Sequence, residues 1–515
     1  MKLFHKLGLE KFSGAARSVL IRRLTVMLLL VAGAIELTGC VTTDRSLITG
    51  RKRAYAYSWA EEVKLGQEAD QSIIAQYGLY DDPDLTHYVD SLGQVLLRFS
   101  EARAPGAPQE VRATPFTFRV LDSPVVNAFA LPGGFVYVTR GLMAHLENEA
   151  QLAVVLGHEI GHVVGRHASI RAVNQTFGQA LVLGGAIGGQ VLLGGDAANT
   201  ILQGGSTVAQ LAFLSHGRDA ERESDRLGVE YAIQAGYNAE ESAEFFNSLK
   251  RLSGDSGSSI PSFLSTHPDP GEREQTIYEL AAEWAKTHPV GKDGRDALLA
   301  RVDDIVAGED PRQGFVEANT FFHPGLAFQF PIPQGYQTIN QPSQVVLIAE
   351  DERSAIRFYL ESGVSTPREA AERFAAQDGL QVVQSGLGSS YGLPAQFVIV
   401  DAPDQNGNVT RARAHFVQYN GQIYGFLGFA AQADYAAREQ GFVQAMQGFA
   451  PLRDPARLAV EPLRVDVRQV SQRTTFAGLV PSGGVNQFSA DELAILNQLQ
   501  LDTVLEVGSR VKLVR

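Results

Sequence analysis

The five residues from His158 to His162, with the sequence HEIGH, constrain this chain more than any other feature. The two histidines are four residues apart, a spacing that places both side chains on one face of a helix. Two imidazoles held in this way can bind one metal ion, and Glu159 then points toward the water that the ion would activate. So short a pattern also occurs by chance in helices that bind nothing, so the surrounding sequence has to decide.

The residues around the motif predict a long, half-buried helix. Asn148 is an N-cap candidate, and a helix-favouring run from Glu149 to Leu156 follows it. Four apolar residues are spaced so that they face a core: Leu152, Val155, Leu156 and Val163. Two satisfied core histidines would fit this helix equally well, so motif and helix alone leave both interpretations open.

A third protein ligand would separate the candidate classes. One class of zinc peptidases extends the motif to HExxHxxGxxH, but here Ala168 stands at the third histidine position and His167 comes one residue early, on a different bearing. The stronger candidate is Glu221, followed four residues later by Asp225 on a second predicted helix. Glu221 would complete a set of two histidines, one glutamate and one water, and Asp225 could accept the outer ring N–H of a ligand histidine. Taken alone, such an acidic pair indicates a solvated helix face.

Over positions 57 to 285 the chain resembles the gluzincin metallopeptidases of family forty-eight, which include the CAAX prenyl protease and the BepA-like periplasmic proteases. The resemblance rests on five ordered blocks: YGLY at 77–80, NAFALPGGF at 127–135, HEIGH with Arg166 and His167, the helix of Glu221 and Asp225, and STHP at 265–268 followed by Arg273. It implies one zinc ion held by His158, His162 and Glu221. It also implies that Glu159 is the general base and that Asp225 supports a ligand histidine.

The same resemblance gives further residues a role near the site. His267 of the STHP block would stabilise the oxyanion or occupy the water position in a latent state, although a histidine before a proline is more often an exposed turn residue. The substrate-binding candidates are Asn127, Ala128, Phe129 and Arg273. Predicted strands at 118–121 and 135–138 could pair with an extended substrate, and plain core strands are the alternative.

The segment at 180–193, between the two metal-binding helices, is apolar but interrupted by paired glycines. It is shorter than the roughly 18 uninterrupted apolar residues that a membrane-spanning helix needs. We interpret it as a lid or loop over the cleft, because glycines destabilise a helix there. A hairpin that touches the membrane is the alternative.

The N-terminal segment predicts where the protein is sent. Six basic residues precede an apolar stretch at 24–35: Lys2, Lys6, Lys11, Arg17, Arg22 and Arg23. The apolar stretch is followed by Leu-Thr-Gly-Cys, which resembles a bacterial lipoprotein signal with Cys40 as the acylated first residue. Because Val41 is not the aspartate of an inner-membrane retention signal, we predict a periplasmic protein anchored to the outer membrane.

Composition and charge exclude one large class of partners. Residues 1–39 carry six Lys or Arg and two Asp or Glu, so the chain without them has a formal net charge of −17 instead of −13. A nucleic-acid partner requires a basic face, and we therefore expect no binding to nucleic acid. With 44% hydrophobic and 20% charged residues, the 515 residues leave room for about three globular domains.

We predict an α+β protein with a mainly helical zincin-type metallopeptidase domain, which contains a small sheet, followed by two accessory domains. The predicted boundaries are 1–39 for the signal peptide, 40–56 for a linker, 57–307 for the metallopeptidase domain, 315–455 for an α+β sandwich similar to PsbP, and 462–515 for a small α/β module similar to LysM. An Asn-Gly pair at 420–421 predicts a hairpin in the sandwich. LysM modules bind N-acetylglucosamine glycans, so peptidoglycan is a possible partner, and a packing module without a ligand is the alternative.

The resemblance and the leader together predict a lipid-anchored periplasmic zinc endopeptidase that degrades misfolded or stalled envelope proteins, including outer-membrane proteins. A chaperone-like or scaffolding lipoprotein with a latent zinc site is one alternative. A cell-wall-associated hydrolase is another, and only the LysM-like segment supports it. No 34-residue repeat is present, so the repeat arm that recruits partners in BepA-like proteins is missing.

Overall fold

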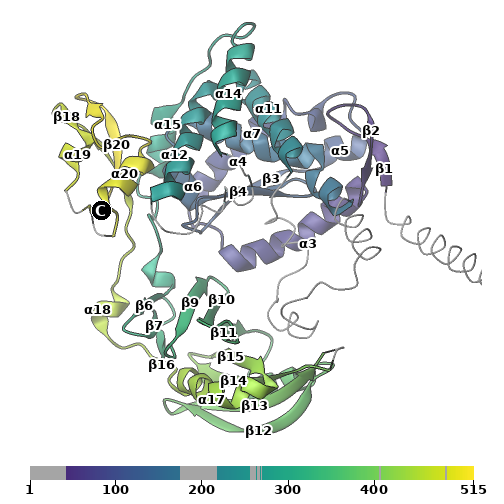
Figure 1. Cartoon of the computed structure of the whole chain (residues 1–515), viewed down its shortest axis with the longest axis vertical. Helices are drawn as coiled ribbons and strands as arrows, with labels where there is room; N and C mark the ends of the chain where they lie inside the picture. The colour runs from purple at the N-terminus through teal and green to yellow at the C-terminus, as the bar shows by residue number, and fades with distance from the viewer. Residues whose placement is uncertain are drawn as a thin grey trace, which may run out of the picture.

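The computed structural model describes residues 42–173, 217–255, 263, 267, 270–404, 407–481, 484–485 and 487–515. The predicted leader, Cys40 and the glycine-rich segment at 180–193 lie outside these residues. Figure 1 follows the chain from a helical N-terminal part, through a strand-rich second part, to a small C-terminal module. In the part of the chain that is described, no helix combines the length and the apolar character needed to cross a membrane.

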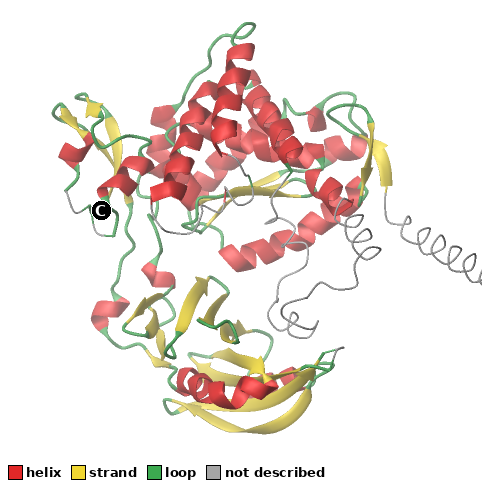
Figure 2. Cartoon of the chain, viewed as in Figure 1, coloured by secondary structure: helices red, strands yellow, loops and turns green. Residues whose placement is uncertain are grey.

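The N-terminal part packs helices around one small sheet (Figures 1 and 2). Its main helices are α3 (Trp59–Tyr77), α4 (Pro83–Leu97), α5 (Gln109–Ala113), α6 (Arg140–His145), α7 (Glu149–Gly165), α11 (Arg218–Gln234), α12 (Ser242–Asp255), α14 (Pro270–Trp284) and α15 (Arg295–Val302). Its sheet is formed by β3 (Thr117–Leu121), β4 (Ala128–Leu131) and β5 (Phe135–Thr139). The strand order is β3-β5-β4, with β3 parallel and β4 antiparallel to β5, so β4 is an edge strand.

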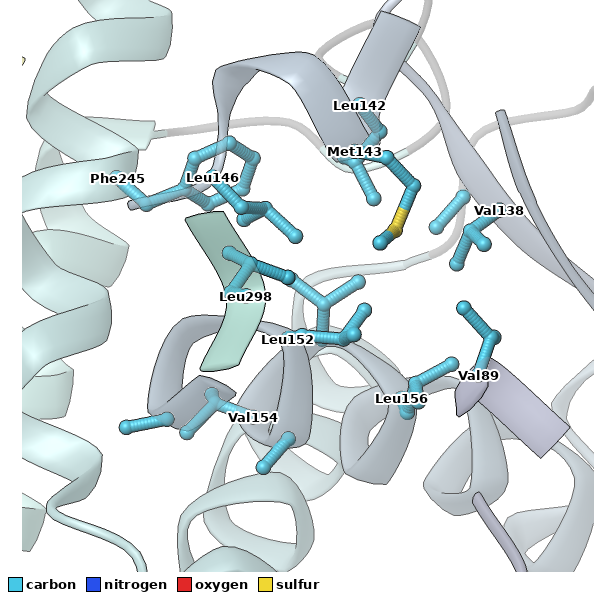
Figure 3. Packing of buried hydrophobic residues seen from close by; sticks show 14 of the residues in the cluster. Val89, Val138, Leu142, Met143, Leu146, Leu152, Val154, Leu156, Phe245 and Leu298 are labelled. Carbon is cyan, nitrogen blue, oxygen red and sulfur yellow. The ribbon is translucent and has the colours of Figure 1, made fainter. Parts of the chain in front are cut away.

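Helix α7 carries the HEIGH motif through the centre of this part. The Asn148 side chain accepts a hydrogen bond from the Gln151 backbone N–H and caps the helix, as predicted. Every residue of α7 is buried, whereas the sequence predicted a half-buried helix. Helices on all sides account for the difference: Figure 3 shows side chains of α4, β5, α6, α12 and α15 meeting around Leu152 of α7.

Glycines bring α7 and α11 into close contact. A Cβ atom at Gly228 of α11 would lie 2.8 Å from the carbonyl oxygen of Val154 and 2.9 Å from the backbone nitrogen of His158. On α7, a Cβ atom at Gly161 would lie 3.2 Å from Cα of Ser224. Side chains at these positions would hold the two helices apart. The small residues therefore let Glu221 and Asp225 of α11 reach the histidines of α7.

The segment predicted as a linker at 40–56 is instead, from residue 42 onward, a hairpin of β1 (Thr42–Arg45) and β2 (Lys52–Tyr55). Tyr55 is buried, and the guanidinium of Arg166 lies 3.8 Å from the centre of its ring. Arg53 pairs with Glu223 of α11 at 3.2 Å. Contacts with residues far along the chain therefore fix this segment against the peptidase helices as a hairpin.

The second part, after residue 314, is built on antiparallel sheets. A seven-stranded sheet has the order β12-β13-β14-β15-β11-β10-β9, and a four-stranded sheet has the order β16-β8-β7-β6. The strands are β6 (Phe315–Glu317), β7 (Thr320–His323), β8 (Phe328–Pro331), β9 (Tyr336–Gln341), β10 (Gln344–Ala349), β11 (Ser354–Glu361), β12 (Gln381–Ser390), β13 (Leu393–Pro403), β14 (Val409–Tyr419), β15 (Gln422–Ala431) and β16 (Ala450–Pro451). Helix α17 (Gln432–Gln447) contributes to one apolar cluster on the larger sheet and α16 (Pro367–Ala375) to another.

The predicted hairpin at Asn420 and Gly421 is confirmed. Tyr419 of β14 pairs with Gln422 of β15 across the two-residue turn. Both turn residues have positive φ, 49° for Asn420 and 76° for Gly421, which is the backbone that an Asn-Gly turn between twisted strands requires.

The C-terminal module is joined to the peptidase helices through a shared core. Its elements are β17 (Val465–Gln469), β18 (Thr474–Thr475), α19 (Phe476–Leu479), α20 (Ala490–Leu496), β19 (Val504–Leu505) and β20 (Arg510–Val514). Apolar residues from these elements belong to the same buried cluster as those of α7 and α12. Lys512 of β20 is fully buried and donates hydrogen bonds to the carbonyl oxygens of Ala144 and Leu146, each at 2.8 Å. The module therefore packs directly against the turn between α6 and α7, just before the start of the helix that carries HEIGH.

Candidate metal centre

Four side chains from three separate segments converge beside α7. The donor atoms of His158, His162, Glu221 and His267 all lie within 4.8 Å of one another, and all four residues are buried. The two histidines of α7 approach each other with their Nε2 atoms 2.9 Å apart. Glu221 comes from the first turn of α11, and His267 lies before α14 in the sequence. Among the described residues this is the one cluster of metal-ligating groups of this kind.

The spacing of the donors suits a small divalent cation. Around tetrahedral zinc, with bonds of about 2.0–2.1 Å, neighbouring donors stand about 3.3 Å apart. Glu221 places its two carboxylate oxygens 3.5 Å from Nε2 of His158 and 3.4 Å from Nε2 of His162. Nδ1 of His267 lies 3.3 Å from Nε2 of His158 and 3.1 Å from Glu221 Oε2. Three imidazole nitrogens and one carboxylate therefore form a four-donor set of the kind that zinc prefers.

Asp225 and Arg273 hold the first histidine from behind. Nδ1 of His158 lies 2.8 Å from Asp225 Oδ1, so the opposite nitrogen, Nε2, faces the cluster. Nε of Arg273 donates to both carboxylate oxygens of Asp225 at 3.1 Å, and its guanidinium packs 4.3 Å from the centre of the Phe246 ring. Burial lowers the pKa of His158 to about 4, with help from the charge of Arg273, so the ring is neutral, as a metal ligand must be.

Glu159 lies next to the donors without being one of them. Its carboxylate is buried, and Oε1 has no hydrogen-bond partner among the described residues. That oxygen is 3.5 Å from Nε2 of His267. Burial raises the pKa of Glu159 to about 7, although the nearby charge of His267 opposes the rise. A carboxylate with a pKa near neutrality can both accept and release a proton at physiological pH.

The balance of charge in the cluster also favours a cation. Burial would lower the pKa of His267, but Glu221 and Glu159 outweigh it and raise that pKa. Burial would raise the pKa of Glu221, but His267 and the other positive groups outweigh it and lower that pKa. The two buried carboxylates, Glu159 and Glu221, thus favour a positive charge beside them, and a divalent ion would supply that charge.

The side chains of the four substrate-binding candidates are buried. The side chains of Asn127, Ala128 and Phe129 are buried, and the ring of Phe129 stacks on Tyr137 at 4.8 Å. Arg273 is likewise buried and uses its N–H groups on Asp225. None of these side chains faces solution, because neighbouring elements cover both faces of β4 and also enclose Arg273. What the edge strand β4 could offer an extended substrate is its backbone.

Two residues at the site were missed as functional candidates. His167 was considered only as a metal ligand, and in the structure its ring instead meets the outer side of His162, with the two Nδ1 atoms 3.0 Å apart. Glu223 lies between Glu221 and Asp225 on α11 and contacts Nε2 of His167 at 3.0 Å. The sequence holds the three acidic residues at alternate positions, but it does not show that Glu223 contacts a histidine just beyond the end of α7.

The raised pKa of Glu159 makes a prediction for the metal-free protein. The folded state holds the proton of Glu159 up to about pH 7, whereas an unfolded glutamate releases it near pH 4.5. The stability of the folded protein should therefore fall by up to about 3 kcal/mol as pH rises through this window. A Glu159→Gln variant should lack that fall and gain stability over the wild type above pH 7. Thermal unfolding of both chelator-treated proteins from pH 4.5 to 8 measures the difference, and parallel curves would contradict it.

Two histidines one helical turn apart, a glutamate between them and a carboxylate from a second helix form the arrangement that is typical of HExxH metallopeptidases of the glutamate-ligand class. Residues 88–281 match the model of Peptidase family M48.

The chain is similar to several proteins over its N-terminal half. It is 31% identical over 247 residues to the beta-barrel assembly-enhancing protease of Yersinia pestis, covering 47% of this chain and 48% of that protein. It is 29% identical over 180 residues to the mitochondrial metalloendopeptidase OMA1 of Arabidopsis thaliana, covering 35% of this chain and 34% of that protein. The chain thus spans less than half the length of each of these relatives.

The solution structure of cyanobacterial PsbP from Synechocystis sp. PCC 6803 is also similar, with a TM-score of 0.22 and 15% identity. The similar region covers 26% of this chain and 91% of the PsbP chain. A TM-score this low does not establish a shared fold, so the likeness of residues 315–455 to PsbP stays a prediction.

Proposed function

We propose that the chain is a zinc endopeptidase of the bacterial cell envelope that degrades misfolded or stalled outer-membrane proteins. The observation that carries the proposal is the convergence of His158, His162 and Glu221 on one point, with the buried carboxylate of Glu159 beside it. The name of the Yersinia pestis relative, beta-barrel assembly-enhancing protease, supports this class of substrate.

His158, His162 and Glu221 would hold the ion. When bound, zinc supplies Lewis-acid catalysis, which makes water acidic enough to lose a proton near neutral pH and offsets negative charge on a substrate oxygen. Glu159 accepts the proton of the attacking water and passes it to the nitrogen of the leaving amine. Asp225, itself held by Arg273, keeps the ring of His158 turned toward the donors.

His267 supports a second candidate, a latent site. A catalytic zinc site keeps one coordination position open, whereas a site with four protein ligands is closed. Nδ1 of His267 stands at the distance of a fourth ligand, and its Nε2 faces Glu159 at 3.5 Å. In this arrangement His267 occupies the place that an attacking water needs. A chaperone-like or scaffolding protein with a closed site is therefore the alternative function.

The remaining parts of the proposal concern location and partners. We propose a lipid anchor at Cys40 that places the protein in the periplasm at the outer membrane, and unfolded or misassembled envelope proteins as substrates. The backbone of β4 would pair with an extended segment of such a substrate beside α7. Residues 462–515 would add contact with peptidoglycan if their resemblance to LysM extends to glycan binding.

Removing the fourth donor should raise the activity of a latent site. We expect His267→Ala to digest casein or an unfolded outer-membrane protein at least about tenfold faster than the wild type, because the position opposite Glu159 becomes open. Digestion rates of the wild type, His267→Ala and Glu159→Gln, measured with equal zinc, test the proposal. If neither the wild type nor His267→Ala cleaves either substrate, the scaffolding alternative replaces the peptidase.

A further inference from the structure

The two ligand histidines of α7 are held from behind by different groups. His158 has Asp225, whereas the outer nitrogen of His162, Nδ1, lies 3.0 Å from Nδ1 of His167. Nε2 of His167 in turn lies 3.0 Å from Glu223 Oε2, and Arg53 of β2 pairs with the same carboxylate oxygen at 3.2 Å. A continuous chain of contacts thus leads from His162 outward to the N-terminal hairpin.

The end of α7 places His167 in this chain. The helix ends at Gly165, and Arg166 adopts a left-handed backbone with φ of 56°, which turns the chain back toward the helix. Nε of Arg166 is held by Glu62 at 2.8 Å. A Cβ atom at Gly165 would lie 2.4 Å from Nε2 of His167, so the ring occupies space that any other residue would fill. The turn and the glycine together fold His167 onto the last turn of the helix.

The proton positions in the chain of contacts are mutually consistent. If Nε2 of His162 binds the ion, its proton is on Nδ1 and is donated to Nδ1 of His167. His167 then carries its own proton on Nε2 and donates it to the Glu223 carboxylate. Ser224 also approaches Nδ1 of His167, at 3.4 Å. Every bond in the series from His162 to Glu223 thus has one donor and one acceptor.

Helix α11 therefore supplies three carboxylates with separate tasks. Glu221 faces the other donor atoms and would bind the ion. Asp225 contacts His158 on its outer side, and Glu223 acts on His162 through His167. We propose that His167 and Glu223 are positioning residues that fix the tautomer and the ring orientation of His162. This inference rests on the proposed zinc site. Groups of this kind typically change metal affinity by about 10- to 100-fold.

The test is a measurement of zinc affinity, which a residue with a purely structural role would leave unchanged. Zinc dissociation constants of the full chain are measured by competition with a chromophoric chelator for the wild type, His167→Leu and Glu223→Gln. Both variants should bind zinc about 10- to 100-fold more weakly. Glu230→Gln is the matched control on α11, because Glu230 pairs with Arg226 at 2.8 Å, away from the donors. It should bind zinc like the wild type.

Two more variants separate positioning from general packing. His167→Gln keeps an acceptor for His162 and a donor for Glu223, so it should restore most of the affinity that His167→Leu loses. Gly165→Ala removes no polar group but pushes the His167 ring aside, so it should weaken zinc binding in the same direction. With cobalt in place of zinc, the visible spectrum should change in His167→Leu and stay close to that of the wild type in His167→Gln.

The outcomes are distinguishable. If the wild type binds no zinc, the proposed function itself is contradicted. If the wild type binds zinc, affinities of His167→Leu and Glu223→Gln within about twofold of it overturn the positioning role. An equal loss in Glu230→Gln also overturns it, because it would indicate general loosening of α11. Should His167→Leu fail to fold when metal-free, Glu223→Gln decides by the same criteria.

Discussion

Replacing Glu159 by glutamine should lower proteolysis by about 100- to 10,000-fold while zinc stays bound. The amide cannot accept the proton of the attacking water. Among the described residues no second carboxylate is placed to do so, since Glu221 would bind the ion and Asp225 is held by His158 and Arg273. The ligands are untouched, so zinc content should stay at the wild-type level. The rate of casein digestion, measured together with zinc content, checks both halves of this expectation.

The substitution is best made in two backgrounds. If His267 closes the site, the wild type has little activity to lose, so Glu159→Gln is also combined with His267→Ala. Glu230→Gln, a half-buried glutamate on α11, serves as the control for a glutamate-to-glutamine change and should keep full activity. Undiminished digestion by a zinc-loaded His267→Ala, Glu159→Gln double variant would remove Glu159 from the proposed role.

The largest expected effect on stability is at Lys512, far from the ion. Its ammonium group is fully buried, donates to the carbonyl oxygens of Ala144 and Leu146 and pairs with Glu147 at 2.8 Å. Burial lowers the pKa of Lys512, and Glu147 opposes that effect. Lys512→Met should destabilise the peptidase part and the C-terminal module together by about 3–5 kcal/mol, because two buried carbonyls lose their donor and the Glu147 carboxylate keeps only Arg295 as a partner. The shift of the first thermal transition measures the loss.

Two controls define what the Lys512 result means. Lys286→Met removes an exposed lysine paired with Glu283 and should change stability by less than about 0.5 kcal/mol. Adding Glu147→Gln to Lys512→Met should recover part of the loss, because the buried carboxylate that has lost its lysine is then replaced by a neutral amide. A single Lys512→Met variant that unfolds at the wild-type temperature would show that the module is not held through this lysine.

Local patterns in the sequence predicted the elements of the site. The period of apolar residues around HEIGH and the i, i+4 spacing of Glu221 and Asp225 are helical features that need no knowledge of the rest of the fold. The Asn-Gly turn at 420–421 is equally local and was also predicted correctly. The close packing of α7 against α11 was not predictable in this way, because it depends on Gly161 facing α11 and on Gly228 facing α7.

Contacts between distant segments account for what the sequence did not predict. The strands β1 and β2 are short and mostly exposed, so they lack the apolar alternation that marks a strand, and Arg53 reaches Glu223 across 170 positions. The strand at 128–131 was not predicted, and the structure packs its Phe129 against Tyr137. Nothing in the local sequence distinguishes Lys512 from a surface lysine. It is buried because the C-terminal module packs against α6.

The zinc content of the purified full chain, measured by mass spectrometry of the metal after removal of loosely bound ions, tests the central claim most directly. The wild type and Glu159→Gln should each carry about one zinc ion per chain, and His158→Ala, His162→Ala and Glu221→Ala should each lose most of it. A wild type without zinc, or a Glu221→Ala variant that keeps a full equivalent, would contradict the metal centre proposed for residues 158, 162 and 221.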